Sequence, residues 1–222
     1  RMPNEMSGGQ RQRVALARAL APEPKLVLLD EAFGALDAAL RNQLRHEVRQ
    51  ILREANATGL LVTHDQDEAL STADRITIMF QGRIIQTGTP TEVYSKPTTI
   101  WVGKFLGECS VLDGTTDGTT LHTALGSRPY NGPVGRVQVL VRPEQLLVYR
   151  ERGASPSGVA ATVTGVEYRG HSTRYRVKLV HNGQELSALQ RGAPAFQVDD
   201  DVIVSAMHDS HILHEPDDPH LL

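Results

Sequence analysis

In the first half of the chain, segments with a helical spacing of hydrophobic residues alternate with short, continuous apolar runs. Between residues 7 and 20 apolar side chains recur at helical intervals among Arg and Gln, and Pro22 ends the run. Residues 26–29 are wholly apolar, as is typical of a strand buried on both faces of a parallel sheet. The alternation continues downstream and indicates an α/β layered domain. We predict further helices at 38–55 and 66–72 and further strands at 60–63, 75–80 and 83–86.

The pattern changes beyond Gly107, where short alternating segments are separated by glycines. Examples of the strands that we predict here are 137–141, 159–166, 173–180 and 202–206. Many short strands with glycine punctuation are typical of an all-β domain, here a small barrel. We therefore expect two domains, an α/β domain over residues 1–107 and a β-barrel over residues 108–222.

Composition narrows the functional classes. The chain has 222 residues, is 40% hydrophobic and carries a formal charge of −3, so it can hold packed cores but lacks the basic excess of a nucleic-acid binder. Its apolar runs are too short to cross a membrane, so a membrane connection would run through a partner. The single cysteine, Cys109, excludes an internal disulfide, and we expect it to be a small buried side chain.

Candidate phosphate chemistry begins at the first predicted helix. Ser7-Gly8-Gly9-Gln10 would leave backbone N–H groups at the positive end of that helix, which suits a phosphate. Taken alone, the tetrapeptide would more often be a flexible helix entry.

Two carboxylates, Asp30 and Glu31, follow the first apolar strand, at the edge where ligands bind in open α/β sheets. Asp30 could hold Mg²⁺ and Glu31 could orient an attacking water, although an acidic helix cap has the same sequence. His64 follows the second strand at the same edge, where an imidazole can donate to a phosphate oxygen. A lone histidine is usually structural. The order of the Ser7–Gln10 motif, the Asp30–Glu31 pair and His64 along the chain nevertheless favours a phosphate site.

These motifs resemble the ATP-binding-cassette (ABC) ATPases. Residues 6–10 are similar to the family's signature motif, and residues 10–20 to its helix. The match continues in phase through a Walker B strand at 26–30, the catalytic glutamate at Glu31, a D-loop at 35–37 and the switch histidine at His64. The resemblance implies a partial P-loop NTPase fold for the α/β domain.

The resemblance also implies roles, cofactors and a dimer. In this family two ATPase domains enclose two nucleotides head to tail, so a homodimer, ATP and Mg²⁺ are expected. Glu31 would polarise the attacking water, Asp30 would anchor Mg²⁺ through water, and His64 would sense the γ-phosphate. Asp37 would communicate across the interface, and the ATP of the opposite subunit would be contacted by Ser7, Gly8, Gly9 and Gln10.

The sequence departs from the family pattern in several places. Met6 replaces Leu, Ala32 replaces Pro and Gly34 replaces Ser, and the last two changes loosen the turn after Glu31. No Gly-x-x-x-x-Gly-Lys-Ser/Thr segment occurs, and the Q-loop is missing. We therefore expect that an N-terminal segment has been lost, that this chain alone cannot hydrolyse ATP, and that its sheet exposes apolar surface.

Residues 140–145, Leu-Val-Arg-Pro-Glu-Gln, resemble the Arg-Pro-Glu motif of the β-barrel domain called TOBE, an OB-like barrel found in importer ATPases. This implies a peripheral subunit at the cytoplasmic face of the membrane. Its partners would be transmembrane permease subunits and, indirectly, a periplasmic or lipid-anchored substrate-binding protein. Residues 65–70 and 142–145 are most similar to ferric-iron importers, with polyamine, sulfate, molybdate and sugar systems as relatives.

Two other functional classes stay open. The chain could be a truncated, non-catalytic regulatory or dimerisation module, which the missing P-loop favours. A soluble cassette ATPase of translation or DNA repair is disfavoured by the β-domain and the lack of a basic surface. Three histidines, His208, His211 and His214, could hold a metal on a helix. A final strand at 212–214 fits them better, because residues three apart on a strand face opposite sides.

Overall fold

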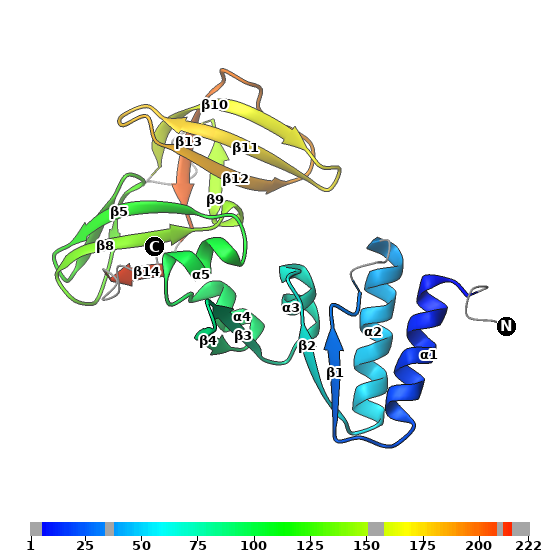
Figure 1. Cartoon of the computed structure of the whole chain (residues 1–222). Coiled ribbons are helices and arrows are strands. Elements are labelled where there is room, and N and C mark those ends of the chain that lie inside the picture. The colour runs from blue at the N-terminus through cyan, green and yellow to red at the C-terminus, as the bar shows by residue number, and fades with distance from the viewer. Residues whose placement is uncertain (1–5, 34–37, 151–157, 208–210, 215–222) are drawn as a thin grey trace. The chain divides into compact units, whose positions relative to one another are not determined.

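A computed structural model describes residues 6–33, 38–150, 158–207 and 211–214 (Figure 1). The chain divides into two compact units. Unit 1 is Arg1–Ile78 with Thr87–Thr91, and unit 2 is Met79–Gln86 with Glu92–Leu222. The predicted domain boundary after residue 107 stays a prediction.

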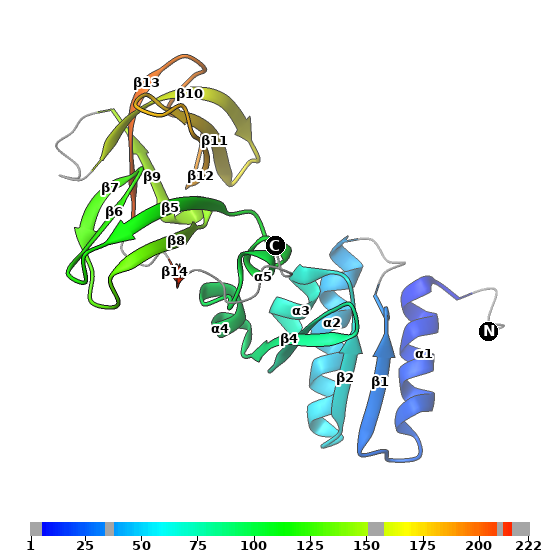
Figure 2. The ribbon, with the colours of Figure 1, turned by 60° about the vertical axis from the view of Figure 1, so that its left-hand side comes forward.

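Unit 1 is built on a two-stranded parallel sheet. The strands β1 and β2 pair in register, with Leu28 opposite Leu60 and Asp30 opposite Val62. Helices α1 and α2 lie beside this sheet (Figures 1 and 2). The predicted helices and the parallel pairing are confirmed by the elements α1 (Gly8–Leu20), β1 (Leu26–Asp30), α2 (Ala38–Glu54), β2 (Thr58–Val62) and α3 (Gln66–Thr72).

One face of the sheet packs on the helices. Leu29 and Leu61 contact a buried cluster that α1, α2 and the residues after β1 form together. Gly59 lies close beneath α2, because a Cβ there would come within 2.8 Å of the Leu52 side chain. The fully buried members of the cluster are Leu16, Phe33, Leu44 and Val48.

The other face of the sheet is open. Leu28 is 68% exposed and Val62 is 56% exposed, and Leu26 and Leu60 are also exposed. The prediction that the first strand is buried on both faces is therefore wrong here, since the described elements of unit 1 cover only one face. The expected exposure of apolar surface is confirmed.

The strands β3 (Ile76–Phe80) and β4 (Arg83–Gly88) form a separate two-stranded sheet. Gln81 and Gly82 join them with φ of 47° and 76°, which are the positive values that a tight hairpin turn requires. The predicted strands at 75–80 and 83–86 are confirmed. Within the described part of the chain, however, β3 does not extend the β1–β2 sheet.

Unit 2 carries two antiparallel five-stranded sheets, after the short helices α4 (Pro90–Ser95) and α5 (Ile100–Phe105). The first sheet has the strand order β14 (His211–His214), β8 (Gly135–Val141), β5 (Ser110–Thr116), β6 (Thr120–Thr123), β7 (Gly126–Pro129). The second has the order β12 (Glu185–Arg191), β11 (Ser172–Leu179), β10 (Val159–Tyr168), β13 (Asp201–Ala206), β9 (Leu146–Tyr149).

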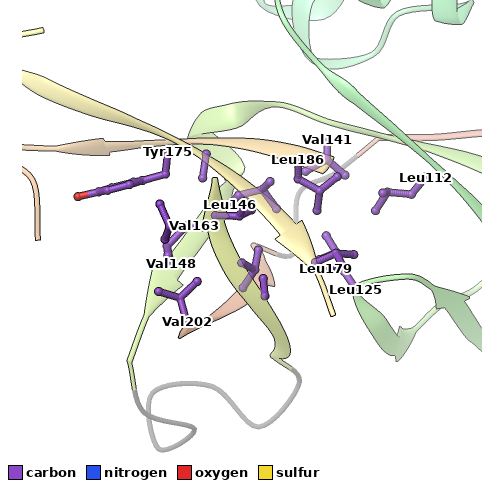
Figure 3. Packing of buried hydrophobic residues seen from close by; sticks show 14 of the residues in the cluster. Leu112, Leu125, Val141, Leu146, Val148, Val163, Tyr175, Leu179, Leu186 and Val202 are labelled. Atoms are coloured by element: carbon purple, nitrogen blue, oxygen red, sulfur yellow. The ribbon is translucent and has the colours of Figure 1, made fainter. Parts of the chain in front are cut away.

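A hydrophobic core lies between these sheets (Figure 3). Leu112 and Val141 reach it from the first sheet, and Val163 and Tyr175 reach it from the second. The second sheet curls until its two edges face each other, and the Gln190 side chain donates to the Val148 carbonyl across the gap at 3.0 Å. The result is a nearly closed, barrel-like sheet, which is consistent with the OB-like domain that the resemblance implies.

Arg142 is a buried cation of unit 2 with several hydrogen-bond acceptors. Its side chain is 3% exposed, and its guanidinium lies 4.2 Å from the centre of the Tyr94 ring. One nitrogen donates to the carbonyls of Gly103 and Gly107 at 2.8 and 2.9 Å, and contacts that of Glu108 at 3.3 Å. Arginine therefore satisfies carbonyl groups at the end of α5 that would otherwise be buried without a donor.

Glu144, which follows Arg142 in the Arg-Pro-Glu motif, holds the same segment. The Tyr94 hydroxyl donates to its carboxylate at 2.7 Å. Burial, followed by this contact with Glu144, raises the pKa of Tyr94 to about 12. Both charged residues of the motif thus fasten the segment around α4 and α5 to the barrel.

His211 lies on β14, and the predicted final strand is confirmed. Its Nε2 is 3.0 Å from the Pro97 carbonyl, so Nε2 donates there and Nδ1 carries the lone pair. Within the described ranges no cluster of three or more potential metal ligands occurs, and His208 lies outside them. None of the described helices is both long enough and apolar enough to span a membrane.

Replacing the Arg142 guanidinium should destabilise unit 2. We expect Arg142→Met to lower its free energy of unfolding by about 3 kcal/mol, because buried carbonyls lose their donors. Trp101 is the only tryptophan of the chain and lies in α5, so urea denaturation followed by its fluorescence measures the change. Arg136→Met, at an exposed position on β8, is the matched control and should have little effect. Equal stability of both variants would contradict the role of Arg142.

His211 should make unit 2 sensitive to acid. Burial lowers the pKa of His211 below its ordinary value of 6.5, and the positive charge of Lys96 adds to this, while the bond to the Pro97 carbonyl opposes it. The unfolded chain takes up a proton as the pH falls below about 6.5, before the folded state does, so stability is present above that pH and is lost below it.

We expect His211→Gln, which keeps a donor for the carbonyl but does not titrate, to weaken the fall in stability between pH 7.5 and 5.5. Urea midpoints followed by Trp101 fluorescence measure this slope. His171→Gln, at an exposed position of the same unit, is the control. An unchanged slope in His211→Gln would show that other groups cause the acid sensitivity.

Candidate functional site

The predicted phosphate motif lies at the start of α1. Ser7 is the N-cap, its hydroxyl accepts from the Gln10 N–H at 3.2 Å, and the Gln10 side chain accepts from the Ser7 N–H at 3.0 Å. This capping box satisfies two backbone donors within the motif itself. Gly8 and Gly9 occupy the first turn, where their N–H groups have no partner inside the helix.

The two acidic residues follow β1 as predicted. Asp30 is its last residue and is exposed. Glu31 continues the ladder, with its N–H donating to the Val62 carbonyl at 2.9 Å. Its φ is 44°, a left-handed conformation that costs a residue with a Cβ about 1–2 kcal/mol. Glu31 therefore sits on a strained turn that directs its side chain away from the strand path.

His64 meets Glu31 across the edge of the sheet. The Nδ1 atom of His64 lies 3.0 Å from Oε1 of Glu31, and the two side chains are 80% and 61% exposed. Because β1 and β2 are parallel, the residues after each strand come to the same edge. A neutral imidazole in this contact carries its proton on Nδ1 and leaves Nε2 with a lone pair toward solvent.

The start of α1 lies at the same end of unit 1 as the carboxyl ends of β1 and β2 (Figure 1). This follows from the chain direction, because α1 and β1 are consecutive and run in opposite directions, so the start of α1 and the end of β1 lie at the same end. The structure thus brings Glu31 and His64 into contact, with Asp30 next to them. No hydrogen bond or ion pair in the described part of the chain joins them to Ser7, Gly8, Gly9 or Gln10, and Asp37 lies outside the described residues.

Sequence reasoning missed a polar network behind His64. Thr63 accepts from the Asp65 N–H at 2.9 Å and donates its hydroxyl proton to Glu68. Asp65 is the N-cap of α3 and accepts from the Glu68 N–H at 3.0 Å. Its other oxygen accepts from Arg45 at 3.0 Å and from Arg41 at 3.3 Å.

The charge state of Asp65 follows from these contacts. The bond from the Glu68 N–H, with the charges of Arg45 and Arg41, holds the pKa of Asp65 below its ordinary value against the opposing effect of burial. One signal in the sequence could have revealed part of the network, since Asp-x-x-Glu is a helix-capping pattern. Nothing in the sequence pairs Asp65 with arginines 20 and 24 residues away.

Two family models match segments of this chain, one in each half. Residues 1–34 match the family model described as ABC transporter, and residues 139–213 match the model described as TOBE domain.

Several curated relatives share most of this sequence. The Fe(3+) ions import ATP-binding protein FbpC 1 of Rhodococcus jostii is 48% identical over 181 residues, which are 81% of this chain and 51% of the relative. A protein of the same name from Haemophilus influenzae strain 86-028NP, FbpC, is 42% identical over 183 residues, 81% of this chain and 52% of its own. FbpC 2 of Pectobacterium atrosepticum is 39% identical over 219 residues, 96% of this chain and 62% of its own. The chain therefore spans about half to three fifths of the length of these relatives.

The strained conformation of Glu31 should cost stability. Because Asn tolerates a positive φ better than Glu, we expect Glu31→Asn to raise the free energy of unfolding of unit 1 by about 1 kcal/mol. Urea denaturation followed by the helical circular dichroism signal measures it. Glu23 has a φ of 53° away from the site, so Glu23→Asn is a matched control and should stabilise similarly. A loss of stability in Glu31→Asn alone would show that the contact with His64 outweighs the strain.

Proposed function

Since the chain carries part of an ABC transporter ATPase domain followed by a TOBE domain, we propose that it belongs to the ATP-hydrolysing subunit of a bacterial importer. The contact between Glu31 and His64 at the carboxyl edge of a parallel sheet carries this proposal. A carboxylate and an imidazole at that edge are the groups that orienting an attacking water and holding a terminal phosphate require.

Each residue at this edge then has a task. Glu31 accepts a proton from the attacking water, and its strained turn and exposed side chain leave it accessible from solvent. His64 holds the Glu31 carboxylate through its Nδ1–H and, as an imidazolium, donates its Nε2–H to the γ-phosphate. Ser7, Gly8, Gly9 and Gln10 contact the ATP held by the opposite subunit, and Asp37 communicates across that interface. Gln10 would leave its capping contact with Ser7 if its side chain bound the nucleotide.

The donor set at this edge fits a magnesium ion bound with ATP. Mg²⁺ keeps several waters and takes only one or two protein carboxylates beside substrate phosphates. Asp30 is an exposed carboxylate next to Glu31, so it would hold Mg²⁺ through water. The ion would supply charge neutralisation on the phosphates. The Lys and backbone cradle of a P-loop do not occur in this sequence, so hydrolysis by the proposed route would need them to be supplied in addition to these residues.

The proposed partners are a second copy of the ATPase subunit, transmembrane permease subunits and, indirectly, a periplasmic or lipid-anchored substrate-binding protein. The subunit would work at the cytoplasmic face of the membrane. Ferric iron is the proposed cargo, because the relatives at 39–48% identity carry Fe(3+) import in their names. Other anions, polyamines and sugars are the alternatives.

A non-catalytic regulatory or dimerisation module is the second candidate. Two observations favour it: the sequence lacks a P-loop, and unit 2 has a complete core of its own. Such a module would act through the barrel and would need neither Glu31 nor His64.

Hydrolysis measurements separate the two candidates. ATP binding and hydrolysis are compared between this 222-residue chain and the same chain extended upstream through a Gly-x-x-x-x-Gly-Lys-Ser/Thr segment. We expect activity only in the extended form and a loss of about 100-fold or more in Glu31→Gln, because a positioned base contributes that much. Glu23→Gln, at an exposed glutamate of similar φ, should keep full activity. If neither form binds ATP, the motor function is wrong and the barrel module is favoured.

A further inference from the structure

The segment that carries His64 is fixed by side chains on both sides of the histidine. Thr63 on one side and Asp65 on the other each make two or more hydrogen bonds through their side chains. His64 itself makes one, to Glu31. An exposed side chain thus stands between two anchored neighbours.

The first anchor is the carboxylate of Asp65, whose two oxygens do different work. Oδ1 caps α3 by accepting from the Glu68 N–H, and Oδ2 binds Arg45 and Arg41 of α2. Arg45 is only 7% exposed, so its charge is desolvated and the pair is geometrically restricted. Asp65 therefore ties the residue after His64 to two helices at once.

The second anchor is the Thr63 hydroxyl. It accepts from the Asp65 N–H and donates to Glu68, a residue 3% exposed. Within the described part of the chain, Oε1 of Glu68 is buried with no hydrogen-bond partner. A buried carboxyl with one oxygen unsatisfied is a poor stabiliser compared with an apolar side chain of the same size. The other oxygen of Glu68, Oε2, accepts from the Thr63 hydroxyl and so holds the residue before His64.

We propose that Arg45, Asp65, Thr63 and Glu68 are positioning residues for His64, which set the imidazole at hydrogen-bonding distance from Glu31. This inference rests on the proposed function, because it assigns a role in that same hydrolysis. None of the four touches the reacting atoms. They act through the backbone of residues 63–65, which they hold between α2 and α3.

Helix α2 carries a second arginine bridge to α3, which serves as a control for the proposal. Arg49 and Arg53 bind Asp74, just beyond the C-terminal end of α3, at 2.6 and 3.4 Å. Arg45 and Arg49 thus make the same kind of bridge from the same helix, one to each end of α3. Of these two bridges, the one from Arg45 reaches Asp65, the neighbour of His64, and the one from Arg49 does not.

The first test needs no nucleotide. Nitrogen-15 NMR of the His64 ring in this 222-residue chain reports which nitrogen carries the proton, and Glu31→Ala defines the signal of a released ring. We expect the wild type to show the Nδ1–H tautomer and both Arg45→Met and Thr63→Val to shift toward the Glu31→Ala signal. Arg49→Met should leave the His64 signal unchanged, even if it lowers stability.

The second test uses hydrolysis by the extended form. We expect Arg45→Met and Thr63→Val to lower kcat about tenfold with a small change in KM for ATP, because a misplaced group costs rate more than binding. Thr63→Ser, which keeps the hydroxyl, should restore most of the rate, and Arg49→Met should keep it.

The outcomes are distinguishable. If Arg45→Met and Thr63→Val match Arg49→Met in NMR signal and kcat, these residues are merely structural and the inference is wrong. If they lower kcat while the His64 signal stays in place, positioning of His64 is also excluded. If Glu31→Gln leaves hydrolysis intact, the proposed function fails, whatever the NMR experiment shows about the position of His64.

Discussion

The parallel ladder between β1 and β2 is the constraint on which the candidate site depends. Its register places Asp30 opposite Val62, so the residues that follow the two strands leave the sheet side by side. Glu31 and His64 are 33 positions apart in the chain, yet their side chains meet at 3.0 Å because of this register. A shift of one residue would turn every side chain of a strand to the opposite face and separate the pair.

Several features near this ladder lower the stability of unit 1. Glu31 adopts a strained φ, Glu68 buries an unsatisfied oxygen, and the outer face of the sheet exposes Leu28 and Val62. Each feature costs free energy locally. The inner face compensates, with Leu29 and Leu61 packed on α1 and α2. In unit 2 the buried guanidinium of Arg142 is matched by carbonyl acceptors.

Much of this organisation could be predicted from the sequence, because local pattern and chain order encode it. The apolar runs and helical spacing gave the strands and helices of unit 1, and the motif order gave Glu31 and His64. Strand β12 was missed because residues 185–191 include good helix formers, and their strand comes from pairing with β11. Strands β6 and β7 are four residues each, too short and polar for a clear alternation.

Tertiary contacts explain the other differences. The bond between Arg45 and Asp65 depends on how α2 packs beside α3, which no local pattern encodes. We expected the first strand to be buried on both faces because residues 26–29 are all apolar. Whether a face is buried depends on the elements that pack on it, and the residues of the strand do not determine these. The hydrogen bonds of Arg142 could not be predicted for the same reason, since the Gly103 carbonyl that it binds is 39 residues away in the sequence.

The central claim is that Glu31 and His64 act as one unit. A double-mutant cycle on ATP hydrolysis by the extended form tests it most directly, with Glu31→Gln, His64→Ala and the double variant measured under one set of conditions. The account predicts strong non-additivity, with the double variant losing little more activity than the more damaging single variant. Losses that multiply independently would contradict it, because they would mean that the contact at 3.0 Å has no part in the reaction.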